Sequence, residues 1–298
     1  MDVRRTSTCA AVLAVLAASS AGCGSHGTST APERAHTAIA LAELRGHIVF
    51  SRLDDNIWTA NADGSALRRL TTRRGAEFDP SWAPDGKQIA YRDSRRGFNH
   101  NDEIYVMSAD GSGQRNLTRS PANQWSPSWS PDGRLIAFCS GRLYVMRADG
   151  SHAHPVTKIK GEYPAWSPDG RRLAFGSPGP DTPGRYANYD VFVVGRDGTG
   201  LRRLTDEPGQ DGWPAWSPDG RSIAFVAARG AGQQDRSIWI MRSDGGGKRR
   251  VAKGEYPVWS PDGRFLMFQV VNQLFVAQPD GSGRRRWPVD GSLPDWGR

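Results

Sequence analysis

The chain has 298 residues and a formal net charge of +8, from 39 basic and 31 acidic residues. Only five basic residues are lysine, and the arginines are spread along the chain instead of forming one block. A nucleic-acid-binding protein gathers its basic residues in a patch or stripe, so the composition argues against nucleic acid as a partner. Anionic lipid headgroups or cell-wall polymers are better candidates.

Residues 1–22 have the layout of a secretory signal peptide. Arg4 and Arg5 precede an apolar run from Cys9 to Ala18, and small residues follow. The run has about half of the ~20 apolar residues that a helix needs to cross a bilayer. We therefore expect an exported protein and no permanent membrane span.

The segment Ala21-Gly22-Cys23 resembles the lipobox of bacterial lipoproteins, although Ser20 stands where Leu, Val or Ile is usual. The resemblance implies acylation of Cys23. Residues 23–45 would then be the lipidated cysteine and a flexible tether, and they would anchor the protein on the outer side of the cytoplasmic membrane. The alternative is cleavage after Ala21 and a soluble secreted protein.

Once the signal peptide is removed, Cys139 is the only cysteine besides Cys23, so no intramolecular disulfide is expected. Cys139 ends the apolar segment 135–139. This position predicts a buried and unreactive thiol.

Residues 46–298 consist of an internal repeat. Five tryptophans begin the pentapeptide Trp-(Ser/Ala)-Pro-Asp-Gly and a sixth begins a truncated copy: Trp82, Trp129, Trp166, Trp216, Trp259 and Trp296. The spacings of 47, 37, 50, 43 and 37 residues bracket the roughly 40 to 45 of a four-stranded propeller blade.

Each repeat predicts four strands, A to D. In the repeat of Trp129, strand A ends at the tryptophan, strand B covers 135–138, strand C covers 143–146 and strand D covers 155–157. Similar third segments at 116–118 and 203–205 predict strand D elsewhere. Ser-Pro-Asp-Gly and Ala-Asp-Gly are tight-turn sequences between A and B and between C and D.

Strand A is expected to be innermost. A proline lies two residues before every repeat tryptophan, and proline cannot donate to a β-ladder, so this strand needs a free edge. In a propeller the free edge faces the central channel. The tryptophans are then expected to pack between blades.

The two ends of the repeat region complete one another. Residues 47–71 supply strands B, C and D of a blade, and residues 293–296 supply a strand A with nothing after it. The prediction is an all-β, six-bladed β-propeller closed by pairing of the C-terminal strand with the N-terminal blade, which leaves no open sheet edge.

Trp-Ser-Pro-Asp-Gly followed by Ile-Ala-Phe, then Ile-Tyr-Val-Met and Ala-Asp-Gly-Ser-Gly, resembles the WD-like propeller repeat of the TolB family. It is also similar to the non-catalytic propellers of prolyl-oligopeptidase-type enzymes. For the TolB family, the resemblance implies docking with an outer-membrane peptidoglycan-associated lipoprotein. We expect the chain to depart from the TolB family in having only a tether where TolB has an α/β domain before its propeller. We likewise expect it to lack the hydrolase domain of the oligopeptidases.

The candidate binding face is the one with varied loops. The A–B and C–D turns lie on one face, whereas the other face has B–C loops that are long at 92–103, 176–190 and 226–237. The residues entering strand A on this face are acidic or aromatic: Glu77, Asp79, Trp125, Glu162, Tyr163, Asp211, Trp213, Glu255 and Tyr256. The long loops add candidate contacts at Arg96, Phe98, His100, Arg185, Tyr186, Tyr189, Arg229 and Arg236.

Two interpretations of the acidic and aromatic channel mouth are open. It could hold Ca²⁺ at Glu162, Asp211 and Glu255, or a basic or amine-bearing segment through charge and cation–π contact. Alternatively, the acids are solvated or paired with loop arginines, and the aromatic rings pack against their neighbours.

No Gly-x-Ser-x-Gly or His-Glu-x-x-His motif occurs. We therefore expect a monomeric, exported and membrane-anchored binding scaffold at the cell envelope, with no catalytic residue and no required cofactor. Its partner would be an envelope protein or a cell-wall component. The alternative function is a Ca²⁺-dependent, lactonase-like hydrolase at the channel mouth.

Overall fold

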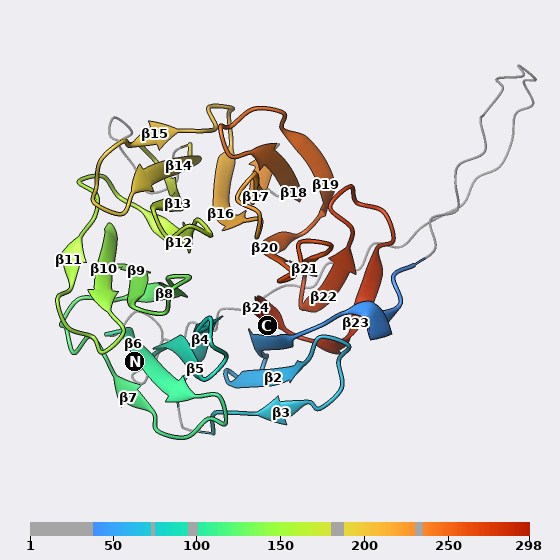
Figure 1. The fold of residues 1–298 in the computed structure, drawn as a ribbon, viewed down its shortest axis with the longest axis horizontal. Helices are drawn as coiled ribbons and strands as arrows, with labels where there is room; N and C mark the ends of the chain where they lie inside the picture. The colour runs from blue at the N-terminus through green and yellow to red at the C-terminus, as the bar shows by residue number, and fades with distance from the viewer. Residues whose placement is uncertain (1–37, 73–74, 95–100, 180–187, 230–234) are drawn as a thin grey trace, which may run out of the picture. The chain divides into compact units, whose positions relative to one another are not determined.

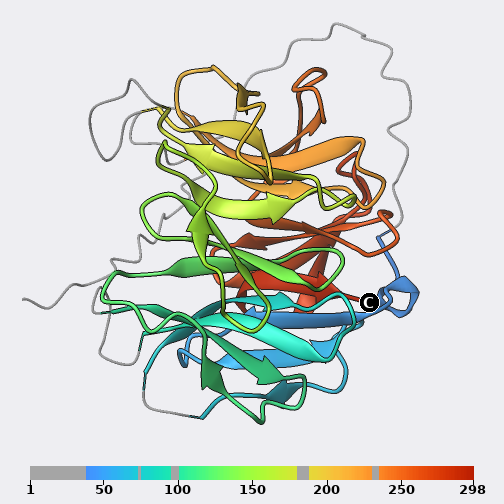
Figure 2. The same ribbon diagram turned by 60° about the vertical axis from the view of Figure 1, so that its left-hand side comes forward.

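The computed structural model describes residues 38–72, 75–94, 101–179, 188–229 and 235–298. Six four-stranded antiparallel sheets are arranged in a ring around a central channel, which Figure 1 shows end-on and Figure 2 shows turned by 60°. The only helical element in the described part of the chain is the short 3₁₀ turn η1 (Leu41–Glu43). The same residues contain no helix that is long and apolar enough to cross a membrane.

The strands of each blade run from the channel outward in the order A to D. Blade 1 contains β24 (Ser292–Gly297), β1 (His47–Ser51), β2 (Ile57–Asn61) and β3 (Arg68–Arg69). Blade 2 contains β4 (Glu77–Trp82), β5 (Gln88–Asp93), β6 (Glu103–Ser108) and β7 (Arg115–Asn116). Blade 3 contains β8 (Trp125–Trp129), β9 (Leu135–Cys139), β10 (Leu143–Arg147) and β11 (His154–Pro155).

The second half of the ring repeats this order. Blade 4 contains β12 (Glu162–Trp166), β13 (Arg172–Ser177), β14 (Asp190–Gly195) and β15 (Arg202–Arg203). Blade 5 contains β16 (Gln210–Trp216), β17 (Ser222–Arg229), β18 (Asp235–Arg242) and β19 (Arg249–Lys253). Blade 6 contains β20 (Glu255–Trp259), β21 (Leu266–Val270), β22 (Gln273–Ala277) and β23 (Arg285–Asp290).

The C-terminal strand closes the ring as the sequence predicts. Strand β24 pairs antiparallel with β1, and Trp296 lies opposite Ile48. The indole N–H of Trp296 also donates to the carbonyl of Arg45 at 2.7 Å. Blade 1 is therefore built from both ends of the repeat region.

The Ser-Pro-Asp-Gly turns are held by their own side chains. In blade 3, the Ser130 hydroxyl donates to the Asp132 carboxylate at 2.6 Å and accepts from the backbone N–H of Leu135 at 2.9 Å. The hydroxyl of Ser130 keeps the pKa of Asp132 below its ordinary value. Gly133 follows with φ +68°, where a β-carbon would be strained.

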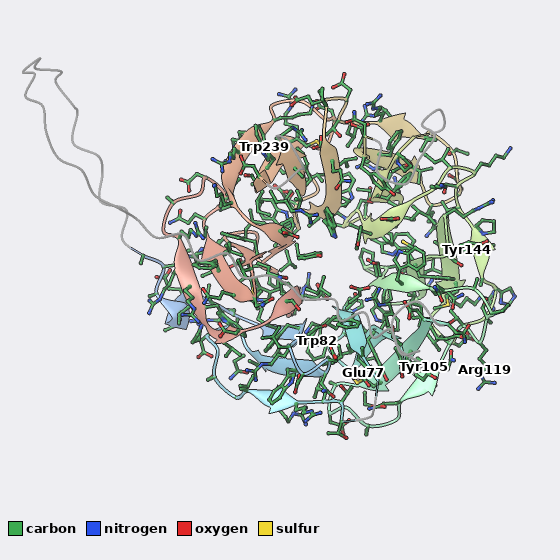
Figure 3. The ribbon with its side chains drawn as sticks, turned by 180° about the vertical axis from the view of Figure 1, so that it is seen from behind. Glu77, Trp82, Tyr105, Arg119, Tyr144 and Trp239 are labelled. Carbon is green, nitrogen blue, oxygen red and sulfur yellow. The ribbon has the colours of Figure 1, made fainter. Side chains whose placement is uncertain are left out.

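The hydrophobic core lies between the blades. Trp129 packs against Ala90 and Val106 of blade 2 as well as Ile136 of its own blade, which confirms the predicted role of the tryptophans. Figure 3 shows the matching Trp82 near the inside of the ring and Trp239 near its periphery. Cys139 is fully buried, and this burial raises the pKa of its thiol well above the ordinary value.

The outermost strands differ from the prediction. Strands β7, β11 and β15 have two residues and begin one residue earlier than the predicted segments 116–118, 155–157 and 203–205. The threonine of the segment explains this shortening in blades 2 and 4. Its hydroxyl accepts the strand-C N–H in place of a backbone carbonyl, as Thr118 does from Ile104 at 3.1 Å and Thr205 from Val191 at 2.9 Å.

Arginines of the outer strands connect neighbouring blades. Arg68 donates to the carbonyl of Ala109, Arg115 to that of Asp149, Arg202 to that of Ser243 and Arg249 to that of Pro279. Each acceptor lies in the C–D turn of the next blade. The matching residue of blade 3 is His154, which bonds to the carbonyl of His152 instead.

Candidate functional site

Strand A of every blade has a kink at the residue before its proline. These six residues, here called the channel ring, have φ between 49° and 54°: Asp79, Ser126, Tyr163, Trp213, Tyr256 and Leu293. The pairing register of strand A shifts near each of them. A left-handed conformation costs a residue with a β-carbon roughly 1–2 kcal/mol, and such residues concentrate at functional sites.

The channel ring and the prolines that follow it line a cavity of about 140 Å³ on the channel axis. Sequence reasoning selected four members, Asp79, Tyr163, Trp213 and Tyr256, but missed Ser126 and Leu293. A signal was present, because each member immediately precedes the proline of its repeat.

The aromatic members of the channel ring pack against one another. The ring centroids of Tyr163 and Trp213 are 4.9 Å apart, and those of Trp213 and Tyr256 are 5.6 Å apart in an edge-on arrangement. Burial raises the pKa of Tyr256 to about 12 and raises that of Tyr163 well above its ordinary value. Both phenols are therefore neutral at physiological pH.

Arginines from the neighbouring strands pair with several of the predicted acids. Asp211 lies 2.6 Å from Arg229 and Glu255 lies 2.8 Å from Arg236. These two arginines, predicted as partner contacts, are thus placed as ion-pair partners within the chain.

The two predicted acids of blade 2 also form contacts within the chain. Asp79 lies 3.6 Å from Arg92 and accepts the N–H of Ser126 at 3.3 Å. Glu77 is 1% exposed and accepts the hydroxyl of Thr71 at 3.2 Å. These contacts favour the interpretation in which the acids are paired and the aromatic rings pack together.

The three residues considered for Ca²⁺ are not brought together. Across the described ranges, no three histidine, cysteine or acidic side chains lie close enough to hold a metal ion. Glu162 and Asp211 line one cavity between blades 4 and 5, whereas Glu255 pairs with Arg236. Among the described residues, the three carboxylates therefore do not gather around one point.

The other predicted residues are placed as follows. Trp125 starts β8 and packs, half-buried, against the core cluster that contains Cys139. The hydroxyl of Tyr189 donates to Glu162 at 3.3 Å. The remaining loop candidates lie outside the described residues: Arg96, Phe98, His100, Arg185 and Tyr186.

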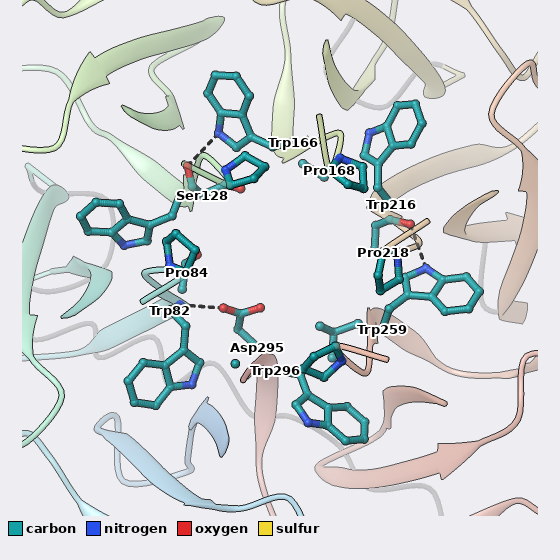
Figure 4. Close-up of a pocket in the computed structure, with 18 of the residues that line it drawn as sticks. Trp82, Pro84, Ser128, Trp166, Pro168, Trp216, Pro218, Trp259, Asp295 and Trp296 are labelled. Carbon is teal, nitrogen blue, oxygen red and sulfur yellow. Dashed lines mark hydrogen bonds between the residues drawn. The ribbon is translucent and has the colours of Figure 1, made fainter. Parts of the chain in front are cut away.

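The opposite mouth of the channel is wider, about 560 Å³, and is lined by the six Trp-containing turns (Figure 4). Sequence reasoning missed Asp295 here. The other five copies have serine, alanine or valine at its position before the tryptophan. Asp295 accepts the backbone N–H of Trp82 at 2.6 Å, and burial raises the pKa of its carboxyl to about 6.

Comparison with known proteins agrees with this architecture. Residues 155–285 match the family model described as TolB beta propeller domain. TolB from Acinetobacter baumannii superposes with a TM-score of 0.70 at 23% identity, covering 85% of this chain and 67% of that one. A putative TolB from Agrobacterium tumefaciens gives 0.64 at 21% identity, covering 83% and 90%.

A more distant likeness is to the tricorn protease, with a TM-score of 0.65 at 16% identity. It covers 83% of this chain and 26% of the protease chain. No curated protein sequence matches the chain. At these identities the solved structures establish the fold and leave the activity open.

Proposed function

Starting from a β-propeller of the TolB type, we propose that this chain is a non-catalytic binding scaffold at the cell envelope, which docks a partner on the face that carries the B–C and D–A connections. The observation that carries the proposal is the channel ring. Each of the six inner strands of a closed scaffold presents one residue with a strained backbone at one mouth of the channel.

The chemistry of this mouth suits a protein surface. Tyrosine and tryptophan are the residue types that most often dominate protein interfaces, because they offer large and rigid contact area. Tyr163, Trp213 and Tyr256 hold one another in place, so little side-chain entropy remains to be lost on binding. The paired acids and arginines around them form a polar rim.

The envelope location is supported by the N-terminal sequence, with its signal-peptide layout and Cys23. Replacing Cys23→Ala is expected to move the protein from the membrane fraction to the soluble exported fraction and to abolish incorporation of labelled palmitate. Membrane attachment that survives this replacement would contradict acylation at Cys23. It would leave the binding proposal intact.

Site-specific photocrosslinking tests the binding face. A benzophenone amino acid at Tyr256, in the channel ring, should give a discrete crosslinked adduct in cells. The same group at Arg171, exposed beside an A–B turn of the opposite face, is the matched control and should give none.

The adduct should disappear when Trp213→Ala is combined with the benzophenone at position 256, because Trp213 packs against the side chain at that position. An adduct at Arg171 with none at Tyr256 would place the partner on the face of the A–B turns and would contradict the proposed site. The absence of adducts at both positions would overturn the proposed site.

A further inference from the structure

A cavity of about 520 Å³ lies on the face of the A–B and C–D turns, opposite the channel ring. Its lining comes from both turns of blade 3 and from the C–D turn of blade 4: Asp132, Arg134, Leu135, Arg147, Ala148, Asp149 and Arg196. These two blades are neighbours in the ring (Figure 1). The cavity is large enough for a small organic group, and it is independent of the binding face proposed above.

Two of the three arginines in this lining depart from the repeat. Arg196 occupies a turn position at which the other blades have alanine, serine or proline: Ala62, Ala109, Ala148, Ser243 and Pro279. Arg147 lies two residues before its turn aspartate, where only blade 5 also has an arginine. That residue, Arg242, pairs with Asp244 of its own turn at 3.2 Å. The other blades form the same turns without these two side chains, so their convergence on one cavity is not required by the fold.

The three guanidinium groups are available to a ligand. Arg134, Arg147 and Arg196 are exposed, and within the described ranges their side chains form no ion pair or hydrogen bond. A fourth guanidinium, that of Arg115, lies beside the same turn and donates to the carbonyl of Asp149 at 3.2 Å. Neighbouring positive charges repel one another, so an anion among them would lower the energy of the folded protein.

The two aspartates of the lining are held by their own turns. Oδ1 of Asp132 accepts the N–H of Arg134 at 3.0 Å, and Oδ1 of Asp149 accepts the N–H of Ser151 at 2.8 Å. Hydrogen bonds from the serine hydroxyl of each turn lower the pKa of both carboxyls, and the charges of Arg134 and Arg196 lower the pKa of Asp132 further. Both aspartates are therefore charged, and three arginines with two aspartates leave the lining at +1.

We propose that this cavity binds a phosphate monoester, with the guanidinium groups of Arg134, Arg147 and Arg196 as donors to its three terminal oxygens. Guanidinium groups bind phosphate through paired N–H donors and stay charged at physiological pH. A carboxylate offers two oxygens to three guanidinium groups, and a neutral alcohol offers no charge. The half-buried Leu135 gives the wall an apolar part for the esterified group.

Calorimetric titration of the full-length protein at neutral pH with sn-glycerol 3-phosphate tests the proposal, with glycerol and sodium glycerate as controls. Only the phosphate should bind. Dihexanoyl phosphatidic acid, which has the same phosphate group, distinguishes the two sources of the ligand. Tighter binding of this lipid than of glycerol phosphate indicates a lipid headgroup, whereas equal or weaker binding indicates a soluble phosphate ester.

Two variants locate the binding. Arg196→Ala and Arg147→Gln should each weaken glycerol phosphate roughly tenfold or more, because each removes a charged donor. Both should leave the melting temperature unchanged, since Ala109 and Gln278 occupy these positions in other blades.

The matched control compares Arg134→Gln with Arg221→Gln. Arg221 is the counterpart of Arg134 in blade 5, is equally exposed and lies outside the cavity. Arg134→Gln should weaken glycerol phosphate roughly tenfold, whereas Arg221→Gln should change its affinity by less than about twofold. The proposal would be overturned if glycerate bound as tightly as glycerol phosphate, if the two variants had equal effects, or if neither phosphate compound bound at millimolar concentration.

Discussion

At the scale of single residues, the position before each strand-A proline is the most unusual feature of the molecule. Six residues with β-carbons adopt a left-handed conformation that normally suits glycine. The same kink in all six blades indicates that the strain comes from the geometry of strand A and not from any one side chain. The side chain at this position is consequently free to vary, from Asp79 to Leu293.

Ser126→Gly tests this strain. Glycine adopts φ +52° without the cost of a β-carbon, so the free energy of unfolding should rise by up to about 1 kcal/mol. Ser126→Ala is the control, because it removes the hydroxyl and keeps the β-carbon, and should give no increase. The measurement is chemical denaturation. A loss of stability in Ser126→Gly with no change in Ser126→Ala would contradict the strain.

Asp295 predicts a pH dependence at the opposite mouth. Its pKa of about 6 in the folded protein lies above the ordinary value of 3.8, so the folded state binds the proton more tightly. Its stabilising contribution is then complete below pH ~4 and is lost as the pH rises through 6. Relative to Asp295→Asn, the wild-type melting temperature should fall between pH 4.5 and 7.5. Parallel melting curves for both proteins would contradict the raised pKa.

Residue-scale prediction from sequence succeeded where the residue type itself carried the signal. The repeat tryptophans, Cys139 and the aromatic members of the channel ring were found because their type and spacing are unusual. Ser126 and Leu293 were missed because neither is acidic nor aromatic. Pairing of the acids with loop arginines was one of two open interpretations, and the loop sequences could not show which arginine lies beside Asp211 or Glu255.

At the scale of elements, the outer strands and the C–D turns form one connected system. The arginine of each strand D bonds to a turn carbonyl of the next blade in four of the six blades, through Arg68, Arg115, Arg202 and Arg249. The glycine of the receiving turn permits this approach. A β-carbon on Gly150 would lie 2.7 Å from the carbonyl oxygen of Leu117 in the preceding blade.

His154→Arg should add the missing contact between blades 3 and 4, where the C–D turn contains Asp197. One additional hydrogen bond of this kind should raise the free energy of unfolding by about 0.5–1.5 kcal/mol, and Arg115→Ala should lower it by a similar amount. Lys158→Arg is the control, since it adds an exposed arginine elsewhere in the same repeat. If His154→Arg and Lys158→Arg had equal effects, the contacts between blades would not contribute.

These contacts could not be predicted from the sequence. Exposed pairs such as Arg68 and Arg69 look like a solvated strand face, and only the stagger of adjacent blades shows that the first of each pair reaches a neighbouring turn. The cavity between blades 4 and 5 was missed for the same reason. Gly176 and Gly212 lie 36 positions apart, in different sheets, and become neighbours only once the blades are packed.

At the scale of the whole molecule, the fold was almost fully predictable. Six blades, the innermost strand A and closure by the last strand follow from the count of repeats and from the positions of Pro and Trp. A repeat pattern determines such an architecture because every blade can bury its faces only against its neighbours. The identity of the partner depends on loop chemistry, which is not repeated.

Removing residues 292–298 tests closure. Blade 1 would lose its innermost strand, β24, together with the buried Trp296. We expect a large fall in melting temperature or failure to fold, since loss of a buried tryptophan side chain alone typically costs about 3–5 kcal/mol. Deletion of Arg298 alone is the control and should be neutral. A seven-residue deletion that melts like the full chain would contradict closure by β24.

If one face of the closed propeller binds a partner through the channel ring, binding should change amide exchange on that face alone. Hydrogen–deuterium exchange of the protein with and without the partner that crosslinking identifies measures this directly. We expect protection on binding at the entries to strand A, around Ser126, Tyr163 and Tyr256, and unchanged exchange at the A–B turns around Gly133 and Gly170. Protection at those turns, with none at the channel ring, would contradict it.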